Sequence, residues 1–135
     1  MEDTSLYCDG ASRGNPGPAA YGVAIFRNGE SLHQLSQAIG RATNNEAEYQ
    51  ALLAAAKWAR DNQIQRAFFY MDSELVVKQI SGIYKVKNER LKSYHLSCKT
   101  ILNSLPFWKI THVPREKNKE ADKLANEALD SLAET

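Results

Sequence analysis

The sequence predicts an α/β protein with a five-stranded mixed sheet, three strands antiparallel and two parallel, flanked by helices. Segments with strand-like alternation fill the first third of the chain, and helical segments alternate with strands afterwards. The Asn28-Gly29 pair is a strong signal for a two-residue hairpin turn, so the early strands are expected to run antiparallel. Later strand–helix–strand units imply parallel crossovers, which complete a mixed sheet.

The whole chain, residues 1–135, has the length of one ordinary domain. Its hydrophobic fraction of 43% is normal for a globular protein and too high for a disordered one. No apolar run approaches the roughly 18 residues that a membrane span needs, and the first five residues lack the basic start and apolar stretch of a secretory signal. Cys8 and Cys98 lack metal-site spacing, so we expect a cytoplasmic protein with free thiols and no membrane partner.

The first strands follow from alternation and turn residues. Residues 6–9 alternate as a short strand that is expected to end at Asp9, and residues 10–18 form a loop dense in glycine and proline. Residues 21–26 and 31–39 are the strands expected on either side of the hairpin turn.

A helix of about four turns is predicted next, because Thr43 and Glu46 have the spacing of a capping box. Its apolar stripe consists of Ala47, Ala51, Ala54, Ala55 and Trp58. The continuous apolar run of residues 67–71 then suits a buried central strand.

The last part of the chain is predicted to hold three more helices and one strand. Ser73 is expected to cap a short helix that Gly82 ends, and a second helix is expected from residue 89 to about residue 102. Residues 107–113 alternate as the last strand, and Asn118 is expected to cap the final helix. The core side of that helix is expected to carry Ala121, Leu124, Ala125, Ala128 and Leu132.

Four acidic residues are candidates for one site. Asp9 and Asp72 are each expected at a strand end, and parallel neighbouring strands would bring both carboxylates to one edge of the sheet. Glu48 lies beside the apolar stripe of the long helix, whereas Glu46 belongs to its first turn and is assigned as the cap. Asp122 lies at the margin of the apolar face of the final helix. Each of these acids also has an ordinary alternative as a turn or cap residue.

The combination of four carboxylates predicts a metal site. Carboxylates packed together repel one another unless a cation neutralises them, and all-oxygen ligation suits Mg²⁺ or Mn²⁺. Two such ions, about 3.5–4 Å apart, can activate a water and stabilise the leaving oxygen in phosphodiester cleavage. The sequence has neither a Cys/His cluster for zinc nor a P-loop. We therefore expect two Mg²⁺ ions, for which Mn²⁺ can substitute.

Four segments resemble the type 1 ribonuclease H family, in family order and over most of the chain: residues 7–17, 43–49, 71–73 and 114–122. The chain is similar to the short archaeal and bacterial members. The resemblance implies the ribonuclease H-like fold and an endonuclease that cuts the RNA strand of RNA–DNA hybrids with two metal ions. It also implies 5′-phosphate and 3′-hydroxyl products. The metal-binding catalytic acids that it implies are Asp9, Glu48, Asp72 and Asp122.

The sequence departs from the better-known family members in two places. The loop before Asp122 lacks the usual histidine, and Arg115 is expected to take its place. His112 falls within the predicted last strand, so a structural role is preferred and a catalytic role stays open. The basic insertion of longer members is missing after Gly82, so the grip on the substrate is expected to be weaker or to come from Lys85, Lys87 and nearby residues.

Small and amide side chains flank the proposed acids and suit contact with a 2′-hydroxyl across the minor groove. The resemblance implies that Gly10, the backbone around Ser12 and the side chains of Asn44 and Asn45 contact the hybrid. It also implies that Asn15 and Thr43 hold a DNA phosphate.

The net charge of +1 removes one common signal of a nucleic-acid-binding domain, which is a strongly basic balance. The expected partner is nevertheless an RNA–DNA hybrid bound by a monomer, and double-stranded RNA stays open as a second substrate. A catalytically silent hybrid-binding module is one alternative, which the presence of all four acids disfavours. A nuclease of the same superfold, such as an exonuclease or an integrase-like enzyme, is another, and the Asn44-Asn45 pair and the loop from Asp9 to Gly17 disfavour it.

Overall fold

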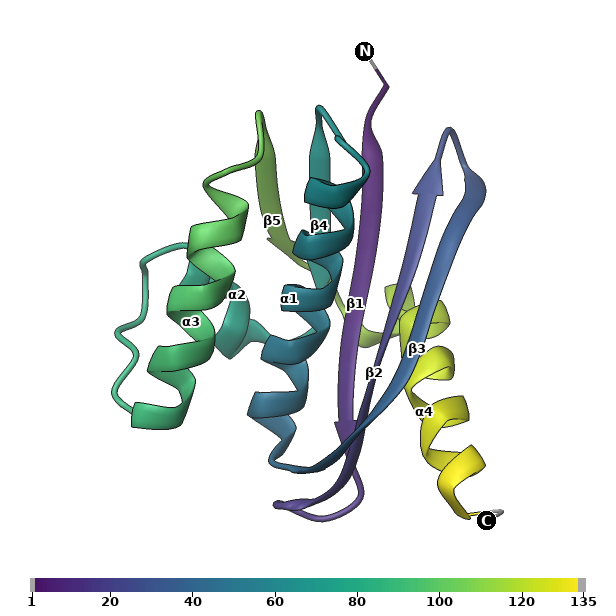
Figure 1. Ribbon diagram of the computed structural model, residues 1–135, viewed down its shortest axis with the longest axis vertical. Coiled ribbons are helices and arrows are strands. Elements are labelled where there is room, and N and C mark those ends of the chain that lie inside the picture. The colour runs from purple at the N-terminus through teal and green to yellow at the C-terminus, as the bar shows by residue number, and fades with distance from the viewer. Residues whose placement is uncertain (1, 134–135) are drawn as a thin grey trace.

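The computed structural model describes residues 2–133. The chain begins with three strands, continues with strands and helices in alternation, and closes with a helix (Figure 1). The elements are β1 (Thr4–Ser12), β2 (Gly17–Arg27), β3 (Glu30–Ala42), α1 (Asn44–Asp61), β4 (Ala67–Met71), α2 (Glu74–Ile80), α3 (Glu89–Leu102), β5 (Trp108–His112), a 3-10 turn (Arg115–Lys117) and α4 (Lys119–Ala133). Within residues 2–133, none of these helices has the length and apolar character of a membrane span.

The five strands form one mixed sheet in the order β3-β2-β1-β4-β5. β2 pairs antiparallel with β1 and with β3, whereas β4 pairs parallel with β1 and with β5. Asn28 and Gly29 both have positive φ, at 54° and 77°, as a tight hairpin turn between twisted strands requires. The predicted mixed sheet is therefore confirmed.

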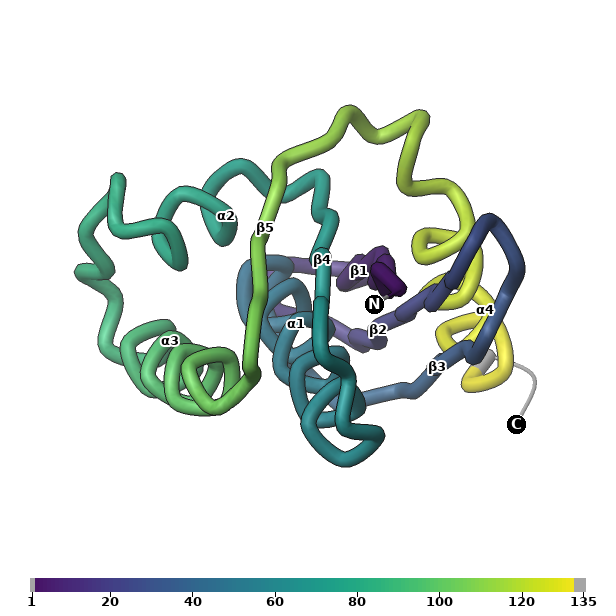
Figure 2. The backbone as a smooth tube through the Cα atoms, turned by 90° about the horizontal axis from the view of Figure 1, so that it is seen from above, coloured from purple at the N-terminus to yellow at the C-terminus, as the bar shows by residue number. Residues whose placement is uncertain are grey.

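Helices cover the two faces of the sheet unequally. α1 and α3 lie on one face and α4 lies on the other (Figures 1 and 2). The main core fills the α1 side, where Leu6 and Cys8 of β1 meet Tyr49 and Leu52 of α1. Cys8 and Cys98 are both free and buried, as expected. Burial raises the pKa of both thiols, that of Cys98 to about 12, so neither is a reactive group.

Two glycines beside Asp9 let α1 and α4 approach the sheet closely from opposite faces. A Cβ atom on Gly10 would lie 2.2 Å from the carbonyl carbon of Ala47 in α1. A Cβ atom on Gly22, the cross-strand partner of Asp9, would lie 2.3 Å from the carbonyl oxygen of Ala121 in α4. In both helices the next residue is one of the four predicted acids. The glycines thus create the space that brings these acids to Asp9.

The expectation that the first strand ends at Asp9 is wrong, because β1 continues to Ser12. Residues 10–12 keep pairing antiparallel with residues 19–21 of β2. Only the parallel pairing with β4 stops earlier, at Cys8 and Met71. Asp9 and Asp72 therefore both follow the last parallel pair and lie at the same edge of the sheet, as the site prediction requires.

Two predictions about the final helix are also wrong. Asn118 does precede α4, but within residues 2–133 its Oδ1 atom has no hydrogen-bond partner and so caps nothing. Its Nδ2 atom instead donates to the carbonyl oxygen of Cys8, at 2.9 Å, because the side chain is turned into the sheet. Leu132 was expected on the core side and is 45% exposed, because it lies in the last turn of α4, beyond the buried Leu129.

Candidate active site

Three of the predicted acids meet at the edge of the sheet. One carboxylate oxygen from each of Asp9, Glu48 and Asp72 lies within 4.8 Å of the other two. Asp9 comes from β1, Asp72 directly follows β4, and Glu48 comes from the beginning of α1. Asp9 and Glu48 are only 6% and 8% exposed, so this cluster of carboxylates is largely removed from water.

The structure confirms Glu46 as the cap of α1 and places Glu48 among the other acids. The Glu46 carboxylate accepts from the backbone N–H of Thr43 at 3.0 Å, and the Thr43 hydroxyl accepts from the backbone N–H of Glu46 at 3.1 Å. Glu46 therefore completes the predicted capping box of α1. Glu48, by contrast, accepts a hydrogen bond from the backbone N–H of Gly10 and points to Asp9 and Asp72.

Burial and like charge work against ionisation of this cluster. Burial raises the pKa of Asp9 well above its usual range, and the negative charges of Glu48 and Asp72 raise it further, as does hydrogen bonding with Asp122 and Glu48. Burial also raises the pKa of Glu48, and the Gly10 N–H offsets part of this effect. A divalent cation bound among these oxygens would relieve the repulsion, so the donor set fits Mg²⁺ or Mn²⁺.

Asp122 lies in the same cleft but outside the group of three. It is half-buried in the first turn of α4 and lies near enough to Asp9 to help raise the pKa of that carboxyl. Its side-chain Oδ1 also accepts from Nδ2 of Asn126, at 3.2 Å. Asp122 is therefore close enough to Asp9 to share a metal site with it, and a neighbouring amide holds its carboxylate.

The carboxylates open into a cleft of about 530 Å³. Four of the predicted substrate contacts line this cleft beside the acids, namely Gly10, Ser12, Asn44 and Asn45. Arg13 and Asn126 line it too and were not anticipated. No motif pointed to them, because an exposed arginine in a loop and an asparagine inside a helix have many ordinary roles.

Both candidates for the role of the missing loop histidine lie at this cleft. Arg115 is exposed in the 3-10 turn after β5, and His112 is exposed at the end of β5. Both line the cleft with the acids. His112 does fall within the last strand, as predicted, and its ring is exposed at the cleft, so the choice between a structural and a catalytic role stays a prediction.

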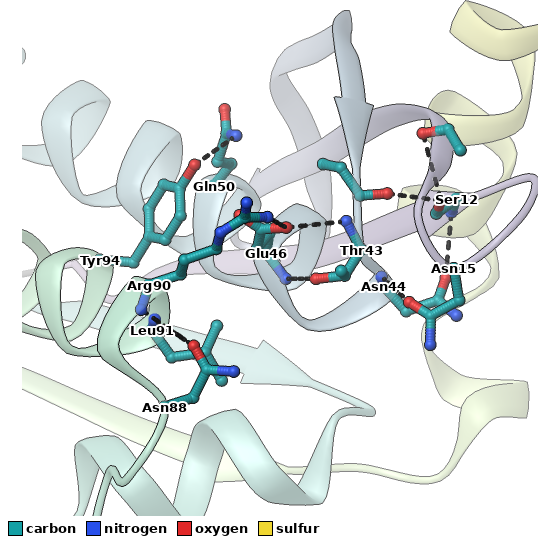
Figure 3. A network of polar contacts seen from close by, with 12 residues as sticks. Ser12, Asn15, Thr43, Asn44, Glu46, Gln50, Asn88, Arg90, Leu91 and Tyr94 are labelled. Carbon is teal, nitrogen blue, oxygen red and sulfur yellow. Dashed lines mark hydrogen bonds and ion pairs between the residues drawn. The ribbon is translucent and has the colours of Figure 1, made fainter.

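A second pocket of about 380 Å³ lies next to the cleft, where the beginnings of α1 and α3 meet. Thr43 caps α1, and Asn88 caps α3 by accepting from the N–H groups of Arg90 and Leu91 (Figure 3). The Arg90 guanidinium lies 3.8 Å from the Glu46 carboxylate. Two helix N-termini beside an arginine form a setting that favours an anion.

Asn15 and Asn44 connect this second pocket to the cleft. The Asn15 side chain accepts from the Asn44 N–H, and the Asn44 side chain accepts from the Ser12 N–H, both at 3.1 Å (Figure 3). Asn15 and Thr43, the predicted phosphate-binding pair, both line the pocket. Asn88 and Arg90 were missed, although Asn88 precedes the predicted start of a helix and could have been recognised as its cap.

The two predicted gripping lysines lie elsewhere. Lys85 and Lys87 are exposed in the segment between α2 and α3, and neither lines the cleft or the second pocket. Lys85 lines a separate basic depression together with Lys92, His95 and Lys99. The structure therefore does not bring these lysines to the carboxylates.

Comparison with known proteins agrees with this geometry. Residues 7–128 match the family model described as reverse transcriptase-like. A ribonuclease HI of Halobacterium salinarum is 46% identical over 125 residues, which are 92% of this chain and 63% of that protein. A bifunctional protein of Mycobacterium tuberculosis is 43% identical over 96% of this chain and 36% of its own length. The chain thus spans less than two thirds of these two relatives.

Solved structures of ribonuclease H proteins are also similar to this chain. The crystal structure of RNase H1 from Halobacterium salinarum has a TM-score of 0.93 and 44% identity, and the match covers 96% of this chain and 98% of that one. The structure of LC11-RNase H1 in complex with an RNA/DNA hybrid has a TM-score of 0.91 and 41% identity, over 97% of this chain and 99% of that one. The chain belongs to the type 1 ribonuclease H family.

Proposed function

We propose that this protein is an endoribonuclease that hydrolyses the RNA strand of RNA–DNA hybrids and leaves 5′-phosphate and 3′-hydroxyl ends. The observation that carries the proposal is the meeting of Asp9, Glu48 and Asp72 within 4.8 Å at an open cleft. Membership of the family supports it, as does a related RNase H1 solved with an RNA/DNA hybrid.

In this proposal Asp9, Glu48, Asp72 and Asp122 hold two Mg²⁺ ions, or two Mn²⁺ ions. Such ions, when bound, supply an activated water and neutralise charge on the leaving oxygen of a phosphodiester. The chain itself supplies the anionic oxygens and the fixed geometry, since Asp9 and Glu48 are buried and held by β1 and α1.

Substrate choice is assigned to the walls of the cleft and to the second pocket. We propose that Gly10, Ser12, Asn44 and Asn45 contact the minor groove, where a 2′-hydroxyl distinguishes RNA from DNA. The second pocket is proposed to bind a phosphate of the DNA strand through Asn15 and Thr43. A phosphate there would also approach the exposed Arg90, whose guanidinium lies 3.8 Å from the Glu46 carboxylate.

We further propose that residues 1–135 act as one ribonuclease H domain, in the cytoplasm and as a monomer. Two buried free thiols suit a reducing compartment. One cleft holds all four acids, so the proposed site requires no second copy of the chain.

The deciding experiment is a cleavage assay with labelled RNA annealed to DNA, in Mg²⁺, in Mn²⁺ and in chelator. We expect cleavage of the hybrid with either ion, none in chelator, and no cleavage of single-stranded RNA or duplex DNA. Asp9→Asn should slow cleavage by about 100-fold or more, equivalent to several kcal/mol of transition-state stabilisation. The matched control is Asp61→Asn, an exposed acid at the end of α1.

Each alternative has its own outcome in this assay. Hybrid binding without cleavage would indicate a silent binding module, and cleavage of duplex DNA would indicate a different nuclease of the same fold. Parental activity in Asp9→Asn would show that the metal site is wrongly assigned. A double-stranded RNA substrate tests the second activity, and phosphatase sensitivity of the products tests the 5′-phosphate end.

The same assay tests which residue takes the role of the missing loop histidine. We expect Arg115→Ala to lower kcat by about 10-fold to 100-fold, or about 1.4–2.7 kcal/mol, because the cation beside the acids is lost, and His112→Ala to lower it less. Arg115→Lys should recover part of the rate if charge alone is needed. A larger loss in His112→Ala than in Arg115→Ala would reverse this assignment.

A further inference from the structure

Asn126 lies one helical turn after Asp122 on the same side of α4, and it lines the cleft. Its half-buried side chain makes two hydrogen bonds with that residue. Nδ2 of Asn126 donates to the backbone carbonyl of Asp122 at 3.0 Å and to Oδ1 of its carboxylate at 3.2 Å. The amide therefore links the Asp122 carboxylate to the backbone of its own helix.

The backbone of α4 at this position is already fixed by other contacts. Asn118 is 1% exposed and binds the carbonyl oxygen of Cys8, the residue before Asp9. Its own carbonyl oxygen accepts from the backbone N–H of Asp122 at 3.1 Å. Gly22 of β2 lets the helix backbone lie directly on the sheet. The freedom that remains at Asp122 is the rotation of its side chain.

We infer that Asn126 is a positioning residue, which holds the Asp122 carboxylate towards the metal-binding acids. The inference rests on the proposed function. Asp122 is the one predicted acid outside the group whose oxygens lie within 4.8 Å of one another, so its orientation decides whether it can join them. A donor on one carboxylate oxygen restricts the rotation of this side chain, which lies in the same cleft as Asp9.

A purely structural role is the competing explanation for the hydrogen bonds between Asn126 and Asp122. An i,i+4 side-chain hydrogen bond on a helix stabilises that helix by only a few tenths of a kcal/mol, whatever the site does. A positioning role, by contrast, alters metal affinity, because residues that orient metal ligands typically change affinity or activity by about 10-fold to 100-fold. Metal binding without substrate therefore separates the two explanations.

The experiment compares Asn126→Leu with Asn126→Gln. Leucine keeps the volume and removes the donor, whereas glutamine can still donate to an aspartate four residues earlier. We expect Asn126→Leu to weaken Mn²⁺ binding by about 10-fold in calorimetry of the substrate-free protein. The Mg²⁺ concentration for half-maximal cleavage should rise by a similar factor. Asn126→Gln should stay within about threefold of the parent chain, and Glu127→Gln, on the exposed side of α4, is the control.

Two results would overturn the inference in distinguishable ways. The first result is a parent chain that binds Mn²⁺ and cuts hybrids, together with an Asn126→Leu variant whose Mn²⁺ affinity and Mg²⁺ requirement equal those of the parent. Asn126 would then have no positioning role. A lower melting temperature alone in that variant would assign it a structural role. If the parent chain binds no divalent ion, the proposed function fails, and the inference fails with it. Weaker Mn²⁺ binding in Asn126→Leu, with near-parental Mn²⁺ binding in Asn126→Gln, supports the inference even when the leucine variant is less stable.

Discussion

Asp9 shows how one residue can serve a site at the expense of stability. It is 6% exposed and faces Glu48 and Asp72, so its ionised form is disfavoured in the metal-free protein. A carboxyl group of this kind has a higher pKa in the folded chain than in the unfolded chain, where it is about 3.9. The folded state therefore binds more protons between these two pKa values, and stability falls as pH rises through that window.

This behaviour predicts that Asp9→Asn stabilises the metal-free protein. Below about pH 3.9 the carboxyl is protonated in both states, so parent and variant should differ little. Above it the parent should lose stability with rising pH and the variant should lose less. At pH 8 in chelator we expect a gain of about 1 kcal/mol in the free energy of unfolding, measured by urea denaturation.

Two controls sharpen this measurement. Asp61→Asn removes an exposed acid and should leave the pH dependence unchanged. Saturating Mg²⁺ should stabilise the parent more than Asp9→Asn, because bound ions relieve the repulsion that the variant has already lost. Equal pH dependence in parent and Asp9→Asn would mean that the buried cluster does not determine the stability of the apo protein.

At the scale of elements, the position of Asp122 depends on the distance between α4 and the sheet. Gly22 lies opposite Asp9 in β2, and a Cβ atom there would come within 2.3 Å of the Ala121 carbonyl oxygen. The Ala121 oxygen belongs to the helix backbone and a Cβ position is fixed by the strand backbone, so neither atom can rotate away. The helix would have to move outward, and Asp122 would move with it.

Gly22→Ala is therefore expected to impair stability and activity together. Overpacking of this kind costs about 1–3 kcal/mol, which urea unfolding can measure. Hybrid cleavage should fall even under conditions where the variant is fully folded, since Asp122 is displaced from Asp9. Gly29→Asn is the comparison, because this turn position has open space around it and asparagine tolerates its positive φ. Full activity in folded Gly22→Ala would show that the site does not depend on this contact.

Several element boundaries followed from local chemistry and others did not. The capping box at Thr43 and the Ser73 cap of α2 are local, and both predictions are confirmed. The true end of β1 depends on pairing with β2, which no local pattern near Asp9 reveals. Asn118 was predicted as a cap because asparagine favours that position. Its amide instead donates to the Cys8 carbonyl oxygen of β1, because a buried carbonyl without a hydrogen bond is costly.

At the scale of the whole molecule, the charge balance bears on how the protein binds a polyanion. Net charge is +1, and the lysines of the segment between α2 and α3 lie apart from the cleft. Phosphate contacts made by such lysines contribute a salt-dependent term to affinity, about 0.9 per contact in the slope of log K against log salt. The hybrid affinity of this protein should accordingly depend only weakly on salt.

Removing Lys85 and Lys87 together tests their proposed grip on the substrate. If both contact phosphates, Lys85→Ala/Lys87→Ala should reduce the salt slope by about 1–2, as measured by fluorescence anisotropy of a labelled hybrid in chelator. Lys57→Ala/Lys109→Ala changes net charge equally at two exposed positions and is expected to leave the slope nearly unchanged. Equal slopes in all three proteins would mean that the two lysines make no phosphate contact.

The sequence by itself determined the order and type of the elements, the hairpin, the choice of Glu48 over Glu46 and three of the acids that meet. These features depend on periodicity, turn chemistry and helix faces, which act over a few residues. Only the tertiary structure decided that Asp122 lies at the margin of the cluster with Asn126 holding it, that His112 reaches the cleft, and that Asn88 and Arg90 join a second pocket. These outcomes depend on where separate strands and helices pack, and they were set by long-range contacts such as those at Gly10 and Gly22.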